Sequence, residues 1–294
     1  MLRWRLVLGA VLIGLMVGLC WLDYSARPAT YLFPLAAVLS LLAAGEMLWL
    51  LAARELRPVP SVVYGGTALV VASNLLPLFV PRFAPTSPIE PLAWPALALT
   101  LVVIWAFLAE MRRYEKPGGV TVSLGVTLLS VAYVGLLFSF VIQLRALGGD
   151  ERGMIALAGM VAVVKGGDIG AYTIGRLFGR HKLAPVLSPG KTIEGAVGAL
   201  AFSCAAAWLM FNWLAPRIVT GLQLPASTWI VFGILVSIAG LVGDLAESLL
   251  KRDLGRKDSS AWLPGFGGVL DIVDSILLAS PVAYLVLYLM GFAN

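Results

Sequence analysis

The sequence predicts an all-α integral membrane protein, a bundle of about nine transmembrane helices with a cytoplasmic N-terminus. Of its 294 residues, 60% are hydrophobic and 13% are charged, and the mean hydropathy is +0.93. A soluble domain carries about 25% charged residues. The apolar residues also form runs of the ~20 residues that a bilayer-spanning helix needs. Finally, lysine and arginine concentrate in every second segment between those runs, as they do in polytopic membrane proteins.

Nine apolar runs, separated by proline, glycine and charged residues, define the predicted spans. They cover residues 6–22, 31–52, 61–80, 92–110, 119–143, 154–174, 194–215, 227–250 and 269–291. The first run resembles a signal peptide, but it is long for one and no small-residue cleavage site follows it, so we expect it to be retained. No polar stretch is long enough for a separate domain. Residues 1–294 are therefore predicted to form one membrane domain, with N-terminal spans in 1–150 and a C-terminal region in 151–294.

Lysine and arginine placement predicts the orientation of the spans. Alternate segments, starting with the N-terminus, hold 15 of the 21 basic residues, and the intervening segments hold five. This bias predicts that the N-terminus and the loops around residues 176–191 and 251–257 are cytoplasmic. We therefore expect a multi-pass protein of the cell inner (cytoplasmic) membrane, with both of these loops on its cytoplasmic face. The net charge of +5 is scattered over short loops, which suits an anionic membrane surface and no nucleic acid.

A first polar region runs from Val163 to Ala199. Lys165 and Asp168 are three residues apart and share a helix face, so they can pair, either as a structural ion pair or as functional charges within the membrane. The cationic loop that follows is open to two interpretations, a topological anchor or a phosphate-binding loop. In the stretch SPGKTIEG, residues 188–195, Pro189 and Gly190 predict a turn, and Lys191 is placed to hold phosphate oxygens.

A second polar region runs from Gly243 to Ser275. Four of its side chains follow i, i+3, i+4, i+7 spacing and form one helical stripe: Asp244, Glu247, Ser248 and Lys251. Asp271 and Asp274 share a face of the last span, and a helical hairpin would bring Asp244 and Asp271 together. Neighbouring carboxylates repel unless a cation lies between them, and Mg²⁺ shared with substrate phosphates fits such a site.

The same region has a competing interpretation, an acid-lined proton or cation pathway. The adjoining basic residues argue against it, because they would repel a cation. Elsewhere, Glu46 stands alone in the middle of a predicted span, and both a polar helix contact and a functional role are open for it. Cys20 and Cys204 match no zinc or disulfide spacing.

These two polar regions resemble the phosphatidate cytidylyltransferase (CDP-diacylglycerol synthase) family. The family signature reads Ser-x-x-Lys-Arg, Lys-Asp, Leu-Pro-Gly-His-Gly-Gly and Asp-Arg-x-Asp. This sequence is similar to it at residues 248–252, 257–258, 263–268 and 271–274, and to an upstream block at 168–172, 179–185 and 188–195. Two positions depart from the signature: Phe266 stands where the family has histidine, and Ile272 where it has arginine.

The resemblance implies that residues 151–294 are a catalytic region, with its active site on the predicted cytoplasmic face. The implied reaction is transfer of CMP from CTP to phosphatidate, giving CDP-diacylglycerol and pyrophosphate for phospholipid biosynthesis. It implies Mg²⁺, with a monovalent cation such as K⁺, and it allows a homodimer among membrane lipids. Asp244 and Asp271 would be linked to the metal and would be catalytic together with Lys251 and Asp274. The predicted substrate-binding residues are Asp168, Arg176, Lys191, Glu194, Ser248, Arg252, Lys257, Asp258, Gly267 and Gly268.

Three alternatives to this activity stay open at the level of sequence. The first is CTP-dependent activation of another lipid phosphate, such as an ether-linked or isoprenoid one. The second is a transporter or channel, with Lys165, Asp168, Asp244 and Asp271 along its pathway. The third is a homologue that has lost catalysis through Phe266 and Ile272, which can neither donate to a phosphate nor neutralise charge.

Overall fold

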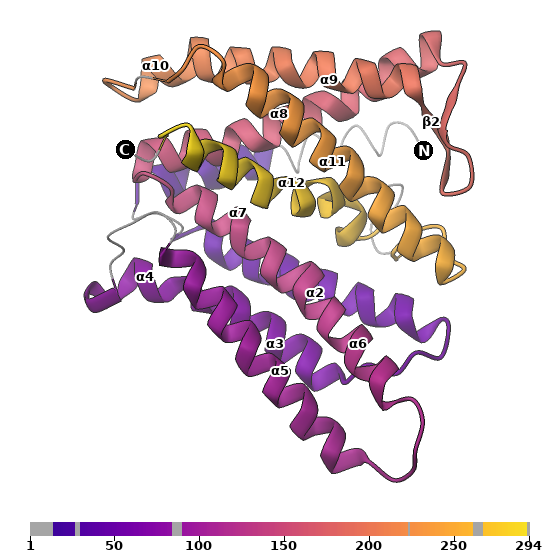
Figure 1. Cartoon of the computed structure of the whole chain (residues 1–294). Coiled ribbons are helices and arrows are strands. Elements are labelled where there is room, and N and C mark those ends of the chain that lie inside the picture. Colours follow the sequence, from indigo (N-terminus) through magenta and orange to yellow (C-terminus); the bar gives the residue numbers. More distant parts are fainter. Residues whose placement is uncertain (1–13, 27–29, 84–89, 223, 261–266, 293–294) are drawn as a thin grey trace. The chain divides into compact units, whose positions relative to one another are not determined.

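The computed structural model describes residues 14–26, 30–83, 90–222, 224–260 and 267–292 (Figure 1). Contacts within the chain divide it into two compact units. Unit 1 comprises Met1–Gln143 and Lys251–Val273, and unit 2 comprises Leu144–Leu250 and Asp274–Asn294. The last two long helices of the chain contribute residues to both units. Residues 251–273 therefore group with the N-terminal spans, whereas the prediction of a single membrane domain stays a prediction.

Eight helices within the described residues are long and apolar enough to cross a membrane, which confirms the predicted all-α membrane fold. They are Leu32–Ala52, Pro60–Phe79, Glu90–Arg113, Val120–Ala146, Asp150–Phe178, Ile193–Ile218, Thr228–Asp253 and Val269–Leu289. Each overlaps one of the predicted spans. The remaining prediction, residues 6–22, lies largely outside the described residues, and its end belongs to a shorter apolar helix, Gly14–Tyr24. The cytoplasmic N-terminus stays a prediction.

Unit 1 is built around α3, which packs against α2, α5 and α6 (Figure 1). A core of small and β-branched side chains fills these contacts, including Val62, Val102 and Val131. Pro60 lies in the first turn of α3, where its missing N–H costs nothing. The elements are α2 (Leu32–Ala52), α3 (Pro60–Ser73), α4 (Leu75–Phe79), η1 (Pro81–Phe83), η2 (Glu90–Leu92), α5 (Ala93–Arg113), α6 (Val120–Val131), the π-helical η3 (Ala132–Leu136) and α7 (Leu137–Ala146).

Unit 2 contains the most extensive helix pair, α8 against α9 (Figure 1). Glycines let the two backbones approach closely, as expected inside a membrane. A Cβ atom added to Gly170 of α8 would lie 2.5 Å from the carbonyl oxygen of Gly198 on α9. The elements are α8 (Asp150–Phe178), β1 (Lys182–Ala184), β2 (Ser188–Thr192), α9 (Ile193–Trp208), the π-helical η4 (Leu209–Leu214), α10 (Ala215–Ile218), α11 (Thr228–Asp253) and α12 (Val269–Leu289).

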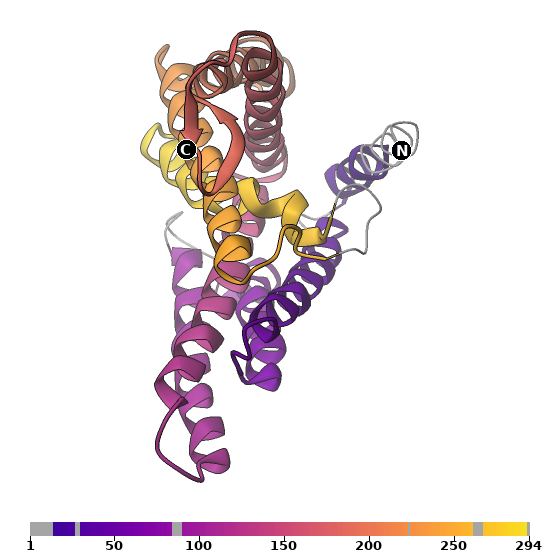
Figure 2. The ribbon, with the colours of Figure 1, turned by 90° about the vertical axis from the view of Figure 1, so that its right-hand side faces the viewer.

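The segment between α8 and α9 folds as an antiparallel β-hairpin, whose strands are the arrows in Figure 2. The prediction of a turn at Pro189-Gly190 was wrong, because both residues lie inside β2 and the turn falls at residues 185–187. Both strands of a two-stranded sheet are edge strands, so a proline can point its N–H side away from the partner strand. The hairpin pairs Lys182 with Thr192, so it closes next to the start of α9.

The close approach of α8 and α9 predicts that Gly170→Ala destabilises the protein. Its new methyl would also lie 2.7 Å from Cβ of Phe202. Overpacking of this kind costs about 1–3 kcal/mol in the free energy of unfolding. Gly125→Ala in α6 is the matched control, because a Cβ atom there meets nothing within 4 Å. Thermal unfolding in detergent micelles measures both variants, and equal midpoints for the two would contradict the packing argument.

Candidate active site

In unit 2, strand β2 directs Lys191 toward α11. The Lys191 ammonium lies 2.7 Å from a carboxylate oxygen of Asp244, and the two side chains are 18% and 38% exposed. The next residue, Thr192, ends the strand and caps α9 by accepting a hydrogen bond from the N–H of Gly195. The start of α9 therefore anchors the end of the hairpin that carries Lys191.

Glu194, in the first turn of α9, anchors the start of the same hairpin. Its carboxylate accepts hydrogen bonds from the N–H groups of Arg180 and His181 and lies 2.7 Å from Nδ1 of the His181 ring. Substrate binding by Glu194 stays a prediction, and its contacts in the structure are with this loop. They fix where the chain enters β1 after α8 ends.

Helices α8, α11 and α12 meet in unit 2 beside Asp274. A Cβ atom on Gly243 of α11 would lie 2.6 Å from the carbonyl oxygen of Asp274. The Asp274 side chain is buried, accepts hydrogen bonds from Ser275, and lies within electrostatic range of Asp244 and Lys165. We call Lys165, Lys191, Asp244 and Asp274 the Asp244 centre.

The predicted pairing of Lys165 with Asp168 is confirmed. Their charged groups are 3.0 Å apart on α8, and both side chains are about half exposed. Further along α8, Arg176 is exposed and donates a hydrogen bond to the hydroxyl of Tyr172. This helix therefore carries charge both beside the Asp244 centre and at its C-terminal end.

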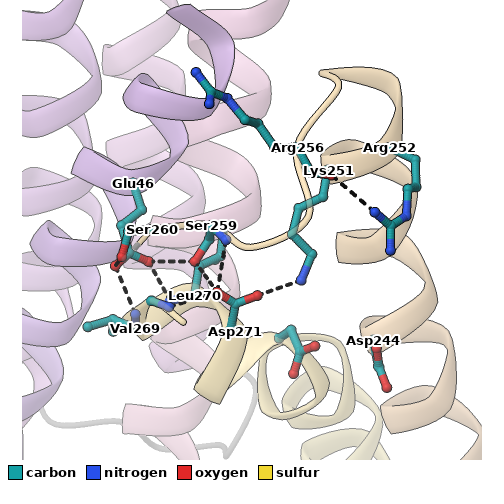
Figure 3. A network of polar contacts seen from close by, with 12 residues as sticks. Glu46, Asp244, Lys251, Arg252, Arg256, Ser259, Ser260, Val269, Leu270 and Asp271 are labelled. Carbon is teal, nitrogen blue, oxygen red and sulfur yellow. Dashed lines mark hydrogen bonds and ion pairs between the residues drawn. The ribbon is translucent and has the colours of Figure 1, made fainter. Parts of the chain in front are cut away.

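In unit 1, Asp271 in the first turn of α12 collects hydrogen bonds on both carboxylate oxygens (Figure 3). Lys251 places its ammonium 2.5 Å from Oδ1. Oδ2 accepts from the N–H of Ser259 at 2.9 Å, from its hydroxyl at 2.5 Å and from the N–H of Gly268 at 2.7 Å. Lys251 and Asp271 are each 11% exposed. We call these residues, with Glu46 and Ser260, the Asp271 centre.

Gly267 and Gly268 allow the side chains of the Asp271 centre to lie close together, because a side chain at either position would collide with them. A Cβ atom on Gly267 would lie 2.4 Å from Oδ2 of Asp271, and φ at Gly267 is +86°, which side chains disfavour. A Cβ atom on Gly268 would lie 2.2 Å from the Ser259 hydroxyl and 2.3 Å from the Glu46 carboxylate. Substrate binding by Gly267 and Gly268 stays a prediction. The structure shows that the pair makes room for two carboxylates of the chain itself.

Glu46 belongs to the Asp271 centre although the sequence did not assign it to the site, and the same holds for Ser259 and Ser260. Glu46 lies on α2 and is 9% exposed. Figure 3 shows its carboxylate facing the hydroxyls of Ser259 and Ser260 and the N–H groups that begin α12. The one signal in the sequence was an isolated carboxylate within an apolar span. That signal marks a buried polar contact but does not name the partner.

The basic segment after α11 is held against α2. The Arg256 guanidinium lies 4.5 Å from the ring centroid of Trp49, a cation–π contact, and Arg54 donates to the carbonyl of Asp253. Other predicted substrate-binding residues lie near this segment: Arg252, Lys257 and Asp258 are exposed, and Ser248 is half-buried on α11. Ile272 is half-buried on α12, and Phe266 lies outside the described residues.

The carboxylates suit a metal ion only if a ligand completes the site. Among the residues that the structure describes, no three histidine, cysteine, aspartate or glutamate side chains converge. Asp244 and Asp271 belong to different units, and each faces a lysine. Mg²⁺ in proteins is commonly bound by one or two carboxylates, with water and substrate phosphates as its other ligands. The donor chemistry therefore fits Mg²⁺ shared with a phosphate substrate, and the metal assignment stays a prediction.

The fold and the two centres define a polytopic membrane protein whose polar side chains suit the handling of phosphate groups. Comparison with known proteins narrows this class. The model of the cytidylyltransferase family matches residues 3–290, nearly the whole chain. The chain therefore belongs to the cytidylyltransferase family.

Relatives from several bacteria are each named phosphatidate cytidylyltransferase. The one from Chlamydia pneumoniae is 34% identical over 200 residues, which cover 65% of this chain and 63% of the relative, less than two thirds of its length. The one from Staphylococcus aureus strain COL is 31% identical over 255 residues, 78% of this chain and 93% of the relative. The one from Bacillus subtilis strain 168 is 35% identical over 167 residues, which cover 57% of this chain and 59% of the relative.

Proposed function

We propose that this cytidylyltransferase transfers CMP from CTP to phosphatidate, giving CDP-diacylglycerol and pyrophosphate. The observation that carries the proposal is the Asp271 centre, in which Lys251 and Asp271 pair within a chain that matches the family from residue 3 to residue 290. The names of the relatives support phosphatidate as the acceptor lipid. The described helices support a membrane protein, which suits a lipid substrate.

The reaction requires charge neutralisation more than proton transfer. An ionised phosphate oxygen of phosphatidate attacks the α-phosphorus of CTP, a new phosphorus–oxygen bond forms, and the bond to the β-phosphate oxygen breaks as pyrophosphate leaves. The nucleophile is ionised at neutral pH, so no protein base is needed. Negative charge on the phosphates is then what the protein must stabilise, and Lys191 and Lys251 are placed beside carboxylates to share that task.

Both centres take part in the proposed reaction. In each centre the aspartate, Asp244 or Asp271, would hold Mg²⁺ with phosphate oxygens of CTP, and the ion would neutralise charge on the leaving pyrophosphate. A monovalent cation such as K⁺ is also part of the proposal, and no residues are assigned to bind it. Arg252 in the last turn of α11 and Lys257 in the segment that follows, both exposed, would contact the nucleotide phosphates.

We place the reaction on the cytoplasmic face of the cell membrane. CTP is a soluble nucleotide, and the excess of lysine and arginine in alternate segments supports a cytoplasmic location for the segments around residues 176–191 and 251–257. Phosphatidate would reach the protein from the surrounding lipid. The homodimer that the family resemblance allows is part of the proposal, with no interface assigned to it.

Transfer of labelled CMP to lipid tests this function. Purified protein with α-labelled CTP, Mg²⁺ and phosphatidate is expected to form labelled CDP-diacylglycerol, and excess EDTA is expected to reduce product to background. Parallel reactions offer an ether-linked phosphatidate and an isoprenyl phosphate. Product with one of these and none with phosphatidate would reassign the acceptor. No product with any lipid phosphate would refute the enzyme assignment.

A further inference from the structure

Glu46 is a buried carboxylate in an apolar span. Among the described residues, its hydrogen-bond donors are Ser259, Ser260, Val269 and Leu270. Oε1 accepts from the Ser260 hydroxyl at 2.9 Å and the N–H of Val269 at 2.9 Å. Oε2 accepts from the Ser259 hydroxyl at 3.1 Å and the N–H of Leu270 at 2.7 Å. A buried charge is costly unless it is hydrogen-bonded, and here both oxygens are. These four residues thus satisfy the Glu46 carboxylate, and Glu46 in turn holds their donor groups in place.

Two of these contacts determine where α12 begins. Val269 and Leu270 are the first two residues of that helix, so their N–H groups have no partner within it. A carboxylate at this position satisfies both groups and interacts favourably with the helix dipole. Asp271 is the next residue of the chain. Glu46 therefore fixes the start of the helix from which Asp271 projects.

Ser259 links the two carboxylates directly. Its hydroxyl lies 3.1 Å from Glu46 and 2.5 Å from Asp271, and its N–H donates to Asp271. A hydroxyl carries a single proton, so it can donate fully to one carboxylate at a time. The Ser259 hydroxyl and the Glu46 carboxylate both pack closely on Gly268, because a methyl group there would collide with each of them. A change at Glu46 must therefore alter the donors around Asp271.

We propose that Glu46 is a positioning residue for Asp271, acting from an N-terminal span through Ser259 and the start of α12. The inference rests on the proposed function in one respect, the role of Asp271 in CMP transfer. Glutamine at position 46 would keep the shape of the side chain. It would, however, turn an amide NH₂ toward donors that now point at an oxygen. The expected result is a misplaced Asp271 in a folded protein.

The test compares Glu46→Gln with Glu110→Gln. Glu110 is also a buried carboxylate in a span of unit 1, held by Arg113 and Ser123, with no contact to residues 259–271 among those the structure describes. We expect Glu46→Gln to lower kcat about tenfold or more, as loss of an orienting partner does, while KM for CTP changes little. Amide hydrogen exchange at Val269 and Leu270 is expected to accelerate in Glu46→Gln and to stay unchanged in Glu110→Gln.

The double variant Glu46→Gln, Asp271→Asn tests whether the two residues act together. If Glu46 acts through Asp271, adding Glu46→Gln to Asp271→Asn leaves the residual turnover where the single Asp271→Asn variant has it. Independent sites would instead multiply their losses of turnover. Equal loss of turnover in Glu46→Gln and Glu110→Gln, or a multiplied loss of turnover in the double variant, would overturn the proposal.

The experiment also distinguishes a folding failure of Glu46→Gln and a failure of the proposed function from a failure of the Glu46 proposal. Should Glu46→Gln not fold, Ser260→Ala removes one donor to Glu46 and leaves all donors to Asp271; a loss of kcat at unchanged melting temperature then supports the proposal, and full activity opposes it. Should the wild-type protein form no CDP-lipid, the proposed function fails. The exchange measurement at Val269 and Leu270 would still decide whether Glu46 fixes the start of α12.

Discussion

Asp271→Asn is expected to lower turnover by on the order of 10²–10³-fold, with CTP still bound. The substitution keeps the size of the side chain but removes its charge, which pairs with Lys251 at 2.5 Å and would pair with Mg²⁺ during the reaction. It also turns an amide NH₂ toward donors that now meet an oxygen, either Lys251 or the Ser259 and Gly268 groups. The measurement is kcat for CMP transfer, taken with phosphatidate in mixed micelles and at several Mg²⁺ concentrations.

Glu115→Gln is the matched control for this prediction. It removes one carboxylate from an exposed position between α5 and α6 and should leave both turnover and melting temperature unchanged. A melting temperature of Asp271→Asn close to that of the control would attribute the loss of turnover to chemistry and not to unfolding. If Asp271→Asn keeps wild-type turnover at every Mg²⁺ concentration, the assignment of the Asp271 centre to the reaction is wrong.

The spans were predictable because a helix that crosses a membrane needs an apolar run of about 20 residues, and such runs are visible in the sequence. The prediction for residues 154–174 located its helix, but α8 extends from Asp150 to Phe178. Its ends carry charged and polar residues that a hydropathy pattern excludes although they continue the helix into the polar region. The hairpin was missed for a related reason. Proline and glycine favour turns locally, yet both lie in a strand here because β2 pairs with β1. Such a pairing depends on contacts between segments, which local sequence preferences do not predict.

The candidate site was predictable only where its chemistry is local in sequence. Spacing along one helix predicted the pairing of Lys165 with Asp168, and the structure confirms it. Glu46 and Ser259 are separated by 213 positions, and no pattern in one sequence joins them. The roles of Gly267 and Gly268 were likewise hidden, because the groups that would collide with a side chain there come partly from another span.

Substitutions in the Lys191–Asp244 ion pair are expected to lower turnover strongly and stability only slightly. The Asp244 side chain is 38% exposed, and a pair this open to solvent contributes about 1 kcal/mol or less to the free energy of unfolding. Lys191→Met and Asp244→Asn are therefore expected to melt within a few degrees of the wild type. Turnover is nevertheless expected to fall on the order of 10²-fold in each, because each removes a charge that the phosphates or their metal require.

Exchanging the two charges in the double variant Lys191→Asp, Asp244→Lys distinguishes the two roles. The exchange keeps an ion pair between β2 and α11, so a purely structural pair would regain both its melting temperature and its turnover. A pair that serves the reaction would regain only the melting temperature, because a lysine at position 244 cannot hold Mg²⁺ and an aspartate at position 191 repels phosphate. We expect the second result. Restored turnover would limit the pair to anchoring the hairpin and leave Asp271 as the carboxylate on which the metal assignment rests.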